Sequence, residues 1–465
     1  MALGQRRQED QGELWIPSGS LVKGPGHPFY AKLNGVLAAE GFDGYVEERC
    51  REYYAPVMGR PGIAPGVYFR MLLVGFLERL DSERGIAWRC QDSLSLREFL
   101  GYGIDEETPD HSSLSRIRVR LSLEVHEEVF GWVLAVLGRR GLIDGKTLGV
   151  DSTTLEANAA LRSIVRRDSG ESYEEFLTRL AKESGVETPT RADLARVDRK
   201  RKNKGSNDDW VNPNDPDAEI AKMKDGHTDM GHKLEQAVDL SGEGAVLAVT
   251  LHGGASGDTG NLAETLSVAD ENLDALREDG KAAAEMHEAA GSEVVTDKGY
   301  HSNEVLTDLE KQGKRAYVSE PDRGRRSWEK QPEAQGAVYA NRRRIRGERG
   351  KRLLRSRGEL LERPFAHYLE AGGMRRTHLR GHAKIMKRLL IHVAGFNLGV
   401  LMRCLVGWGT PKQYAEAAAA LLRAIFGLVG RIWRTRERIA WFAAGDLAIP
   451  GVPSPNSPIQ LCHVA

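Results

Sequence analysis

The spacing of apolar residues predicts a helical part near the start of the chain. Residues 61–143 contain four short stretches in which apolar residues recur at helical spacing, and tight turns separate them. Ser82 begins the second of these stretches and Ser93 lies within it, and either Asp110 or Ser112 precedes the third, so these residues are expected to cap helices. We therefore predict an all-helical domain over this part of the chain.

The pattern then changes to short apolar runs that are typical of strands. Runs at 147–151 and 293–297 each end on an aspartate, and two alternating runs, 232–240 and 242–254, meet at a turn rich in Ser and Gly. Helical stretches lie between and after these strands. The order of strand, hairpin, helix, strand, helix and strand predicts a mixed α/β domain over 144–405 with a partly parallel sheet.

Three other segments depart from these patterns. Residues 1–60 are rich in Gly, Pro and polar residues, which favours an arm with little regular structure. Residues 156–231 hold two expected helices but are too polar to build a core of their own, so we expect an insertion on the surface. Residues 406–465 form a tail, in which an apolar and basic helix precedes a Pro- and Ser-rich end that we expect to be disordered.

Composition favours a cytosolic protein without identifying its partner. Lys plus Arg equals Asp plus Glu at 66 each, so the distribution of charge is more informative than its sum. The four cysteines are far apart and form no CxxC pair, which predicts neither a disulfide framework nor a structural zinc site. The N-terminus lacks the apolar segment of a signal peptide. The apolar run 389–408 contains His, Asn and Arg, so we expect a buried core helix and no membrane partner.

Positive charge is concentrated in one segment, residues 341–357, where Glu348 is the only acid. Arginine prevails there, and its planar guanidinium suits phosphate, so double-stranded DNA is the expected partner; a solvated basic helix is the alternative. Arg116, Arg118 and Arg120, on a predicted helix of the N-terminal domain, either contact phosphates or form an ordinary solvated face. The basic residues of the segment are Arg342, Arg343, Arg344, Arg346, Arg349, Lys351, Arg352, Arg355 and Arg357.

Three acids stand out against this basic background. Asp151 and Asp297 each end a predicted strand, and Glu362 lies on a predicted helix that follows the basic segment. Neighbouring strands and a helix packed on them can bring three carboxylates together, and three carboxylates ionise comfortably at one point only around a cation. Oxygen ligands suit Mg²⁺ or Mn²⁺, and two such ions can clamp a phosphodiester. The alternative is that the aspartates are turn or cap residues and that Glu362 pairs with nearby arginines. Rival acids are Asp144, Asp239, Asp258 and Glu359.

Several motifs, in this order, resemble the DDE transposases of bacterial insertion sequences. They are "GVDSTTLEANA", "VVTDKGYHSNEVL" and "RSRGELLERPFAHYLEAGGMRRTHLRG", followed by Asn397 and Leu398. The stretches "SERGIAWRCQDSLSLREFLGYG" and "TPDHSSLSRIRVRL" resemble the helical N-terminal domain of the same group. The resemblance covers roughly residues 60–405.

The resemblance implies a ribonuclease-H-like fold, a mixed sheet flanked by helices, behind an all-helical DNA-binding domain. It implies Asp151, Asp297 and Glu362 as catalytic acids that hold Mg²⁺ or Mn²⁺, two ions in all. Many relatives carry an Arg four residues before the Glu and a Lys seven after it, but Gly358 and Leu369 stand at these positions. Glu359 therefore remains a rival third acid.

The resemblance also implies the activity and the partners. A transposase of this kind cuts DNA at the terminal inverted repeats of its element and joins the ends to target DNA, usually as a homodimer, and it works in the cytoplasm on the nucleoid. Lys298, Tyr300 and Arg363 are expected beside the DNA, although Tyr300 could equally be a packed core residue. Two other functions fit the same motifs: a catalytically inactive, transposase-derived DNA-binding protein, and a nuclease that cuts but does not join.

Overall fold

The computed structural model describes residues 26–55, 62–201, 205–223 and 225–445, except positions 323, 325, 327 and 330. Within these bounds the chain separates into a large unit, up to Pro411, and a second unit that begins at Lys412. The described part of the second unit belongs to one helix, α16 (Pro411–Gly445), whose large apolar side chains between Leu421 and Trp433 are exposed. The start of the expected arm, the Pro- and Ser-rich end of the tail and Cys462 lie outside the described residues.

The expectation of little regular structure over residues 1–60 is wrong for its second half. Helix α1 (Pro28–Ala39) and helix α2 (Phe42–Cys50) fold there, followed by the short helix η2 (Arg51–Tyr53). Pro28 is the first residue of α1, and Gly41 adopts a left-handed conformation with φ of 72° between the two helices. The Pro and Gly residues that suggested a loop are thus helix boundaries.

The predicted helical domain is confirmed as helical, with five helices in place of four. Ser93 divides the second predicted helix in two, because its side chain accepts the backbone N–H of Leu96 and caps a new helix. Ser82 and Asp110 also act as N-caps, as predicted. The helices are α3 (Pro65–Leu77), α4 (Glu83–Asp92), α5 (Leu94–Leu100), α6 (His111–Arg120) and α7 (Leu123–Gly138).

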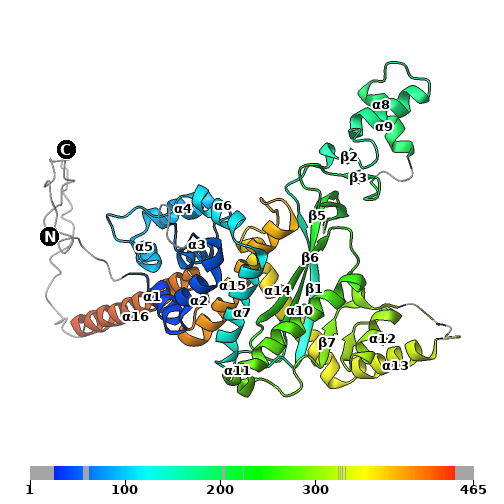
Figure 1. Ribbon diagram of the computed structural model, residues 1–465. Coiled ribbons are helices and arrows are strands. Elements are labelled where there is room, and N and C mark those ends of the chain that lie inside the picture. The colour runs from blue at the N-terminus through cyan, green and yellow to red at the C-terminus, as the bar shows by residue number, and fades with distance from the viewer. Residues whose placement is uncertain are drawn as a thin grey trace, which may run out of the picture. The chain divides into compact units, whose positions relative to one another are not determined.

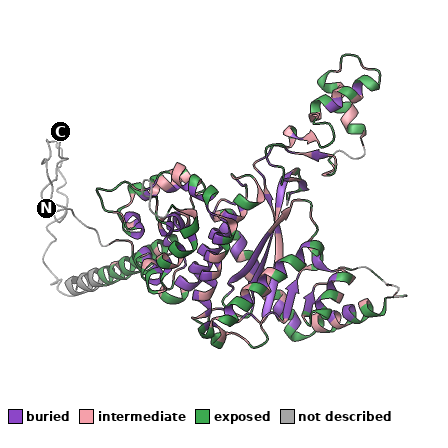
Figure 2. Cartoon of the chain, viewed as in Figure 1, coloured by how far each residue is buried: buried purple, intermediate pink, exposed green. Residues whose placement is uncertain are grey.

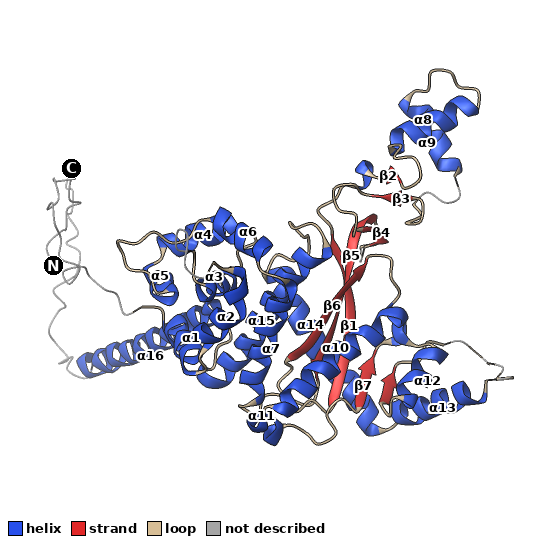
Figure 3. Ribbon diagram, viewed as in Figure 1, coloured by secondary structure: helices blue, strands red, loops and turns tan. Residues whose placement is uncertain are grey.

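The mixed sheet is confirmed, and it is built around strand β1 (Thr147–Glu156), which has partners on both sides (Figure 3). Strand β5 (Thr228–Asp239) pairs with it in antiparallel fashion, and β7 (Glu293–Thr296) pairs with it in parallel. The outer strands are β6 (Val246–Gly253) and the short β4 (Glu219–Lys222), both beside β5, and β8 (Arg315–Val318), which is parallel to β7. The predicted hairpin is β5 and β6.

Helices cover both faces of this sheet (Figure 1). Adjacent residues of β5 show which helix lies on which face: Glu235 accepts a hydrogen bond from Thr265 of α10, whereas Gln236 donates to Leu361 of α14. Side chains alternate along a strand, so α10 and α14 lie on opposite faces. The helices of this part are α10 (Asp258–Glu278), α11 (Gly280–Glu285), α12 (Asn303–Lys311), α13 (Pro332–Arg346), α14 (Glu348–Phe365) and α15 (His382–Val406).

Helix α15 is the core helix that the sequence predicted. Its apolar run belongs to a stretch long and apolar enough to cross a membrane, but 78% of the most apolar window is buried inside the protein (Figure 2). Lys387 donates to the backbone oxygens of Arg118 and Leu121 at 3.1 and 2.7 Å, and this ties α15 to the N-terminal helices. Asn397 bonds both backbone groups of Val246, where β6 begins.

The insertion between β1 and β5 has a core of its own, contrary to prediction. Trp210 is 1% exposed, and its ring lies 5.1 Å from that of Tyr173 and 5.2 Å from that of Phe176. Sequence polarity was misleading because only a few side chains, separated along the chain, supply this core. The predicted helices are confirmed, and the elements are β2 (Val165–Arg166), α8 (Tyr173–Glu183), α9 (Arg191–Lys200) and β3 (Trp210–Val211).

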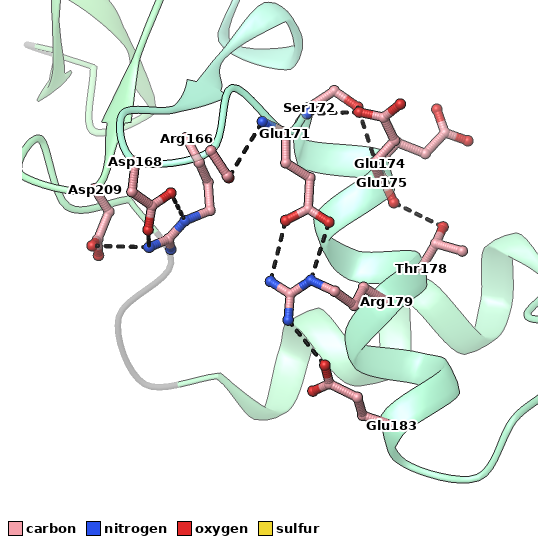
Figure 4. A network of polar contacts seen from close by, with 11 residues as sticks. Arg166, Asp168, Glu171, Ser172, Glu174, Glu175, Thr178, Arg179, Glu183 and Asp209 are labelled. Atoms are coloured by element: carbon pink, nitrogen blue, oxygen red, sulfur yellow. Dashed lines mark hydrogen bonds and ion pairs between the residues drawn. The ribbon is translucent and has the colours of Figure 1, made fainter.

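Ion pairs stabilise the outside of the insertion (Figure 4). Arg179 of α8 lies between Glu171, at 3.1 Å, and Glu183, at 3.0 Å. Arg166 pairs with Asp168 at 2.6 Å. The polar residues of the insertion therefore pair with one another around its small core.

Candidate active site

Two of the predicted acids lie at the same level of adjacent strands, Asp297 just after the end of β7 and Asp151 in the middle of β1, not at its end as predicted. Gly149 of β1 is paired with Val295 of β7, and the two strands run in parallel. Asp151 and Asp297 each follow that pair by two residues, so parallel pairing brings both carboxylates to the same level, where β7 ends beside β1. The backbone N–H of Gly299 donates to Asp297 at 2.8 Å, which fixes the turn after β7.

Helix α14 covers the sheet at this level. Arg357 pairs with Asp151 at 3.1 Å, and one turn later the carbonyl of Leu361 accepts from Gln236, the residue opposite Asp151 on β5, at 2.8 Å. Tyr368 donates to the same Gln236 side chain. The backbone of α14 is thereby bonded to the strand that neighbours the first acid.

The end of α14 is irregular where it passes the site. Pro364 lies inside the helix and has no N–H to donate. The next segment, η5 (Ala366–Ala371), winds as a wider π-helix, a form that often marks functional sites. This local unwinding turns Tyr368 toward the sheet, where its side chain is buried.

The third predicted acid makes no contact with the two aspartates among the interactions of the described chain. Glu362 is exposed, and so is its rival Glu359, which pairs with Arg363 at 3.2 Å. At about 100° per residue, Glu362 and Glu359 are separated from Arg357 by about 140° and about 160° around the helix. Both therefore lie away from the side of α14 that faces Asp151, and the helix geometry does not choose between them.

Asp258, which we named above only as a rival acid, belongs to the immediate surroundings of the site. Gly257 is the N-cap of α10, and Asp258 is the first helical residue. Its side chain accepts from Ser152 at 2.7 Å and pairs with Lys233 at 2.5 Å. No local signal could reveal this, because three separate elements supply the contacts.

A buried carboxyl lies behind the site, on the α10 face of the sheet. Glu235 accepts from Tyr300 at 2.7 Å and from Thr265, and all three side chains are buried. Burial, assisted by the negative charge of Asp258, raises the pKa of Glu235 to about 7, although the hydrogen bonds from Thr265 and Tyr300 act in the opposite direction. Tyr300 is therefore a packed core residue, and its burial argues against the predicted contact with DNA.

The raised pKa of Glu235 makes a prediction about stability. The folded protein binds this proton more tightly than the unfolded chain does, so stability is greatest at low pH. We expect it to fall as pH rises from 4.5 to about 7 and to stay level above that. The loss is at most about 3 kcal/mol, from about 1.4 kcal/mol per pKa unit.

Urea unfolding at pH 5, 6, 7 and 8 checks this expectation. Glu235→Gln should be more stable than the wild type at pH 8 and should show a flatter pH profile. The control is Glu271→Gln, which changes an exposed acid on α10. Equal slopes for the wild type and Glu235→Gln would contradict the prediction.

The predicted basic segment spans α13 and α14, and about half of its basic side chains make contacts inside the protein. These side chains bind acids or backbone oxygens of the same chain, so they are less available to DNA. The contacts are Arg342 with Glu320 at 2.6 Å, Arg344 with the Ala316 carbonyl at 2.9 Å, Arg349 with Glu293 at 2.6 Å, Lys351 with Glu348 at 2.8 Å, and Arg357 with Asp151 at 3.1 Å. The others, Arg343, Arg346, Arg352 and Arg355, are exposed.

The arginines of α6 differ in a similar way. Arg116 is exposed and bonds only to serines of its own helix, which leaves it accessible. Arg118 is buried and paired with Glu83, so its position argues against a contact with phosphate. Arg120 lies 5.3 Å from the ring of Tyr54. Lys298, in the turn after Asp297, is exposed.

The donor chemistry at the site suits a hard divalent cation, although the described part of the chain contains no group of three acids, histidines or cysteines already arranged around one point. Asp151 and Asp297 offer carboxylate oxygens, the ligands that Mg²⁺ and Mn²⁺ prefer. Arg357 carries the positive charge that neutralises Asp151, and the buried Nε of Arg357 has no hydrogen-bond partner among the described residues. The surroundings of Asp151 therefore already hold one positive group.

Comparison with known families gives two matches, which cover parts of the chain on either side of Asp151 and Asp297. A transposase domain model (DUF772) matches residues 19–120, which hold α1 to α6, and a transposase DDE domain model matches residues 309–402, which hold Glu362. No curated protein and no solved structure gives a match. DDE transposases generally use divalent metals and act on DNA. The two matches, in this order along a mixed α/β chain, support an insertion-sequence DDE transposase.

Proposed function

We propose that this transposase cuts DNA at the ends of its element and joins them to target DNA, with Asp151, Asp297 and Glu362 as its catalytic acids. The observation that carries the proposal is the parallel pairing of β1 with β7, after which each strand presents a carboxylate. The strand order supports a ribonuclease-H-like core: when the edge strand β4 is left out, Asp297 follows the fourth strand of the sheet in chain order, as the resemblance implies.

The cofactor that fits this site is Mg²⁺ or Mn²⁺, as two ions held by Asp151, Asp297 and Glu362. Bound ions would make a water molecule a better nucleophile and would stabilise charge on the leaving oxygen. Arg357 would then exchange Asp151 for a phosphate oxygen, which its guanidinium suits. Gln236 and Tyr368 would keep α14 seated on the sheet while Arg357 changes partner.

The proposed partner is double-stranded DNA, first the terminal inverted repeats and then the target. Four exposed arginines, Arg343, Arg346, Arg352 and Arg355, would contact phosphates next to the site. The helical domain would read the repeats, with Arg116 as a phosphate contact. We further propose that two copies act together on paired ends and that the protein works in the cytoplasm on the nucleoid.

One observation favours a second function, that of a catalytically inactive, transposase-derived DNA-binding protein. Asp151 is paired with Arg357, and Glu362 is exposed and apart from both aspartates in the described interactions. If this arrangement persists on DNA, the ends would be bound but not cut.

An excision assay separates these functions and identifies the third acid. The substrate is a plasmid that carries the gene with its genomic flanks, and the cofactor is Mg²⁺. Glu362→Gln should lower excision by about a thousandfold, equivalent to about 4 kcal/mol. Glu359→Gln, on the same helix, should change excision by less than about threefold.

The reverse pattern would make Glu359 the third acid. Wild-type protein that binds the ends but never cuts them would support the inactive protein. Cut ends that are never found in target DNA would indicate a nuclease.

A further inference from the structure

We propose that Asp258 is a positioning residue for this reaction, because it fixes the spacing between Asp151 and Asp297. The inference rests on the proposed function, since it assumes that Asp151 and Asp297 hold the metal ions. Asp258 is the first residue of α10 and is therefore distant in sequence from both β1 and the turn after β7. Three contacts place its carboxylate between them.

The first contact links Asp258 to β1. Ser152 donates its hydroxyl to Asp258 at 2.7 Å, and its backbone N–H donates to Asp151 at 2.9 Å. Ser152 therefore connects the two carboxylates directly. Any displacement of Asp258 is transmitted to the residue on which Asp151 depends for its orientation.

The second contact links Asp258 to the turn that holds Asp297. A Cβ atom on Gly299 would lie 2.7 Å from Asp258 Oδ2 and 3.0 Å from Asp297 Oδ1. Both oxygens thus border the same small space, which only a glycine leaves open. Since Asp297 also accepts the Gly299 N–H, the turn packs against Asp258 on one side and is held by Asp297 on the other.

The third contact explains how two carboxylates can remain so close. Like charges repel unless a cation compensates. Lys233 of β5 supplies that positive charge at 2.5 Å from Asp258, and its ammonium also donates to the Ser256 carbonyl at 3.1 Å. The ion pair with Lys233 thereby holds the Asp258 carboxylate in place beside the turn of Asp297.

The same helix offers a matched control. Asp270 of α10 pairs with Lys314 at 2.7 Å, in a second aspartate–lysine pair that has no contact with the two aspartates of the site among the described interactions. If Asp258 served only to anchor α10, loss of either pair would have similar effects. A positioning role predicts that only the loss of Asp258 changes metal binding.

The test is a titration of the full-length protein with Mn²⁺, followed by electron paramagnetic resonance, together with the rate of excision at saturating Mn²⁺. Asp258→Ala should weaken Mn²⁺ binding by about tenfold, the lower end of what loss of a supporting residue costs a metal site. Asp258→Asn should recover most of that loss, because its amide oxygen still accepts from Ser152. Asp270→Ala should bind Mn²⁺ like the wild type, and Asp151→Asn should bind it poorly.

The outcomes distinguish this inference from the function on which it rests. Equal Mn²⁺ affinity for Asp258→Ala and Asp270→Ala overturns the positioning role, provided that Asp151→Asn has lost affinity. Wild-type protein that binds no Mn²⁺, or Asp151→Asn that binds it normally, overturns the proposed function and this inference together. If Asp258→Ala does not fold, Ser152→Ala decides: a weaker affinity supports the role, and an unchanged one refutes it.

Discussion

Replacing Asp297 by asparagine is expected to abolish both cutting and joining while leaving DNA binding intact. Asparagine has nearly the same shape, and its amide oxygen can still accept the Gly299 N–H that fixes the turn. Only the charge is lost, and with it a ligand for the metal ions. We expect a rate at least about a thousandfold lower, equivalent to about 4 kcal/mol of transition-state stabilisation.

Strand transfer of pre-cut ends into a target plasmid measures this effect, and a gel shift on the same ends measures binding. The matched control is Asp308→Asn, which changes an exposed acid on α12, the helix that follows the turn. Its rate should equal that of the wild type. Full activity of Asp297→Asn would show that Asp297 does not hold the metal.

Replacing Trp210 by alanine should unfold the insertion without unfolding the sheet. Trp210 is the largest side chain in a small core that is separate from the main one, and its removal should cost about 3–5 kcal/mol locally. Hydrogen exchange by mass spectrometry should then show loss of protection in α8 and α9, while β1, β5 and β7 stay protected.

Trp210→Phe is the control, because phenylalanine keeps a ring against Phe176 and the indole N–H of Trp210 has no partner in the described structure. It should retain most of the protection. If Trp210→Ala lowers protection equally in β5 and in α8, the insertion is part of the main cooperative unit.

Much of the fold could be predicted from local patterns. The hairpin, the aspartate after β7 and the caps at Ser82, Ser93 and Asp110 all depend on neighbours within a few residues. The prediction that the first strand ends at Asp151 is wrong, because β1 continues to Glu156. The helices of the N-terminal arm were missed because Gly41, a helix boundary, gives the same signal as a loop. Local sequence therefore predicted the boundaries of helices and strands better than it predicted which segments form them.

The candidate site was less predictable, because its contacts cross long stretches of sequence. Nothing near Asp258 indicates that Ser152, 106 residues earlier, donates to it. The same holds for Tyr300, whose hydroxyl meets a glutamate 65 residues away and so becomes a core group. The basic segment was recognised, but which of its arginines face inward depends on acids such as Glu320 in a different element.

The double pairing of β1 also sets when the protein can finish folding during synthesis. Its antiparallel partner, β5, begins at Thr228 and its parallel partner, β7, only at Glu293. Helix α7 completes its packing later still, because its partner α15 begins only at His382. Contacts so distant in sequence form slowly, and early strands keep an open edge until then. A ribosome must therefore release nearly the whole large unit before either the N-terminal helices or the acids reach their final places.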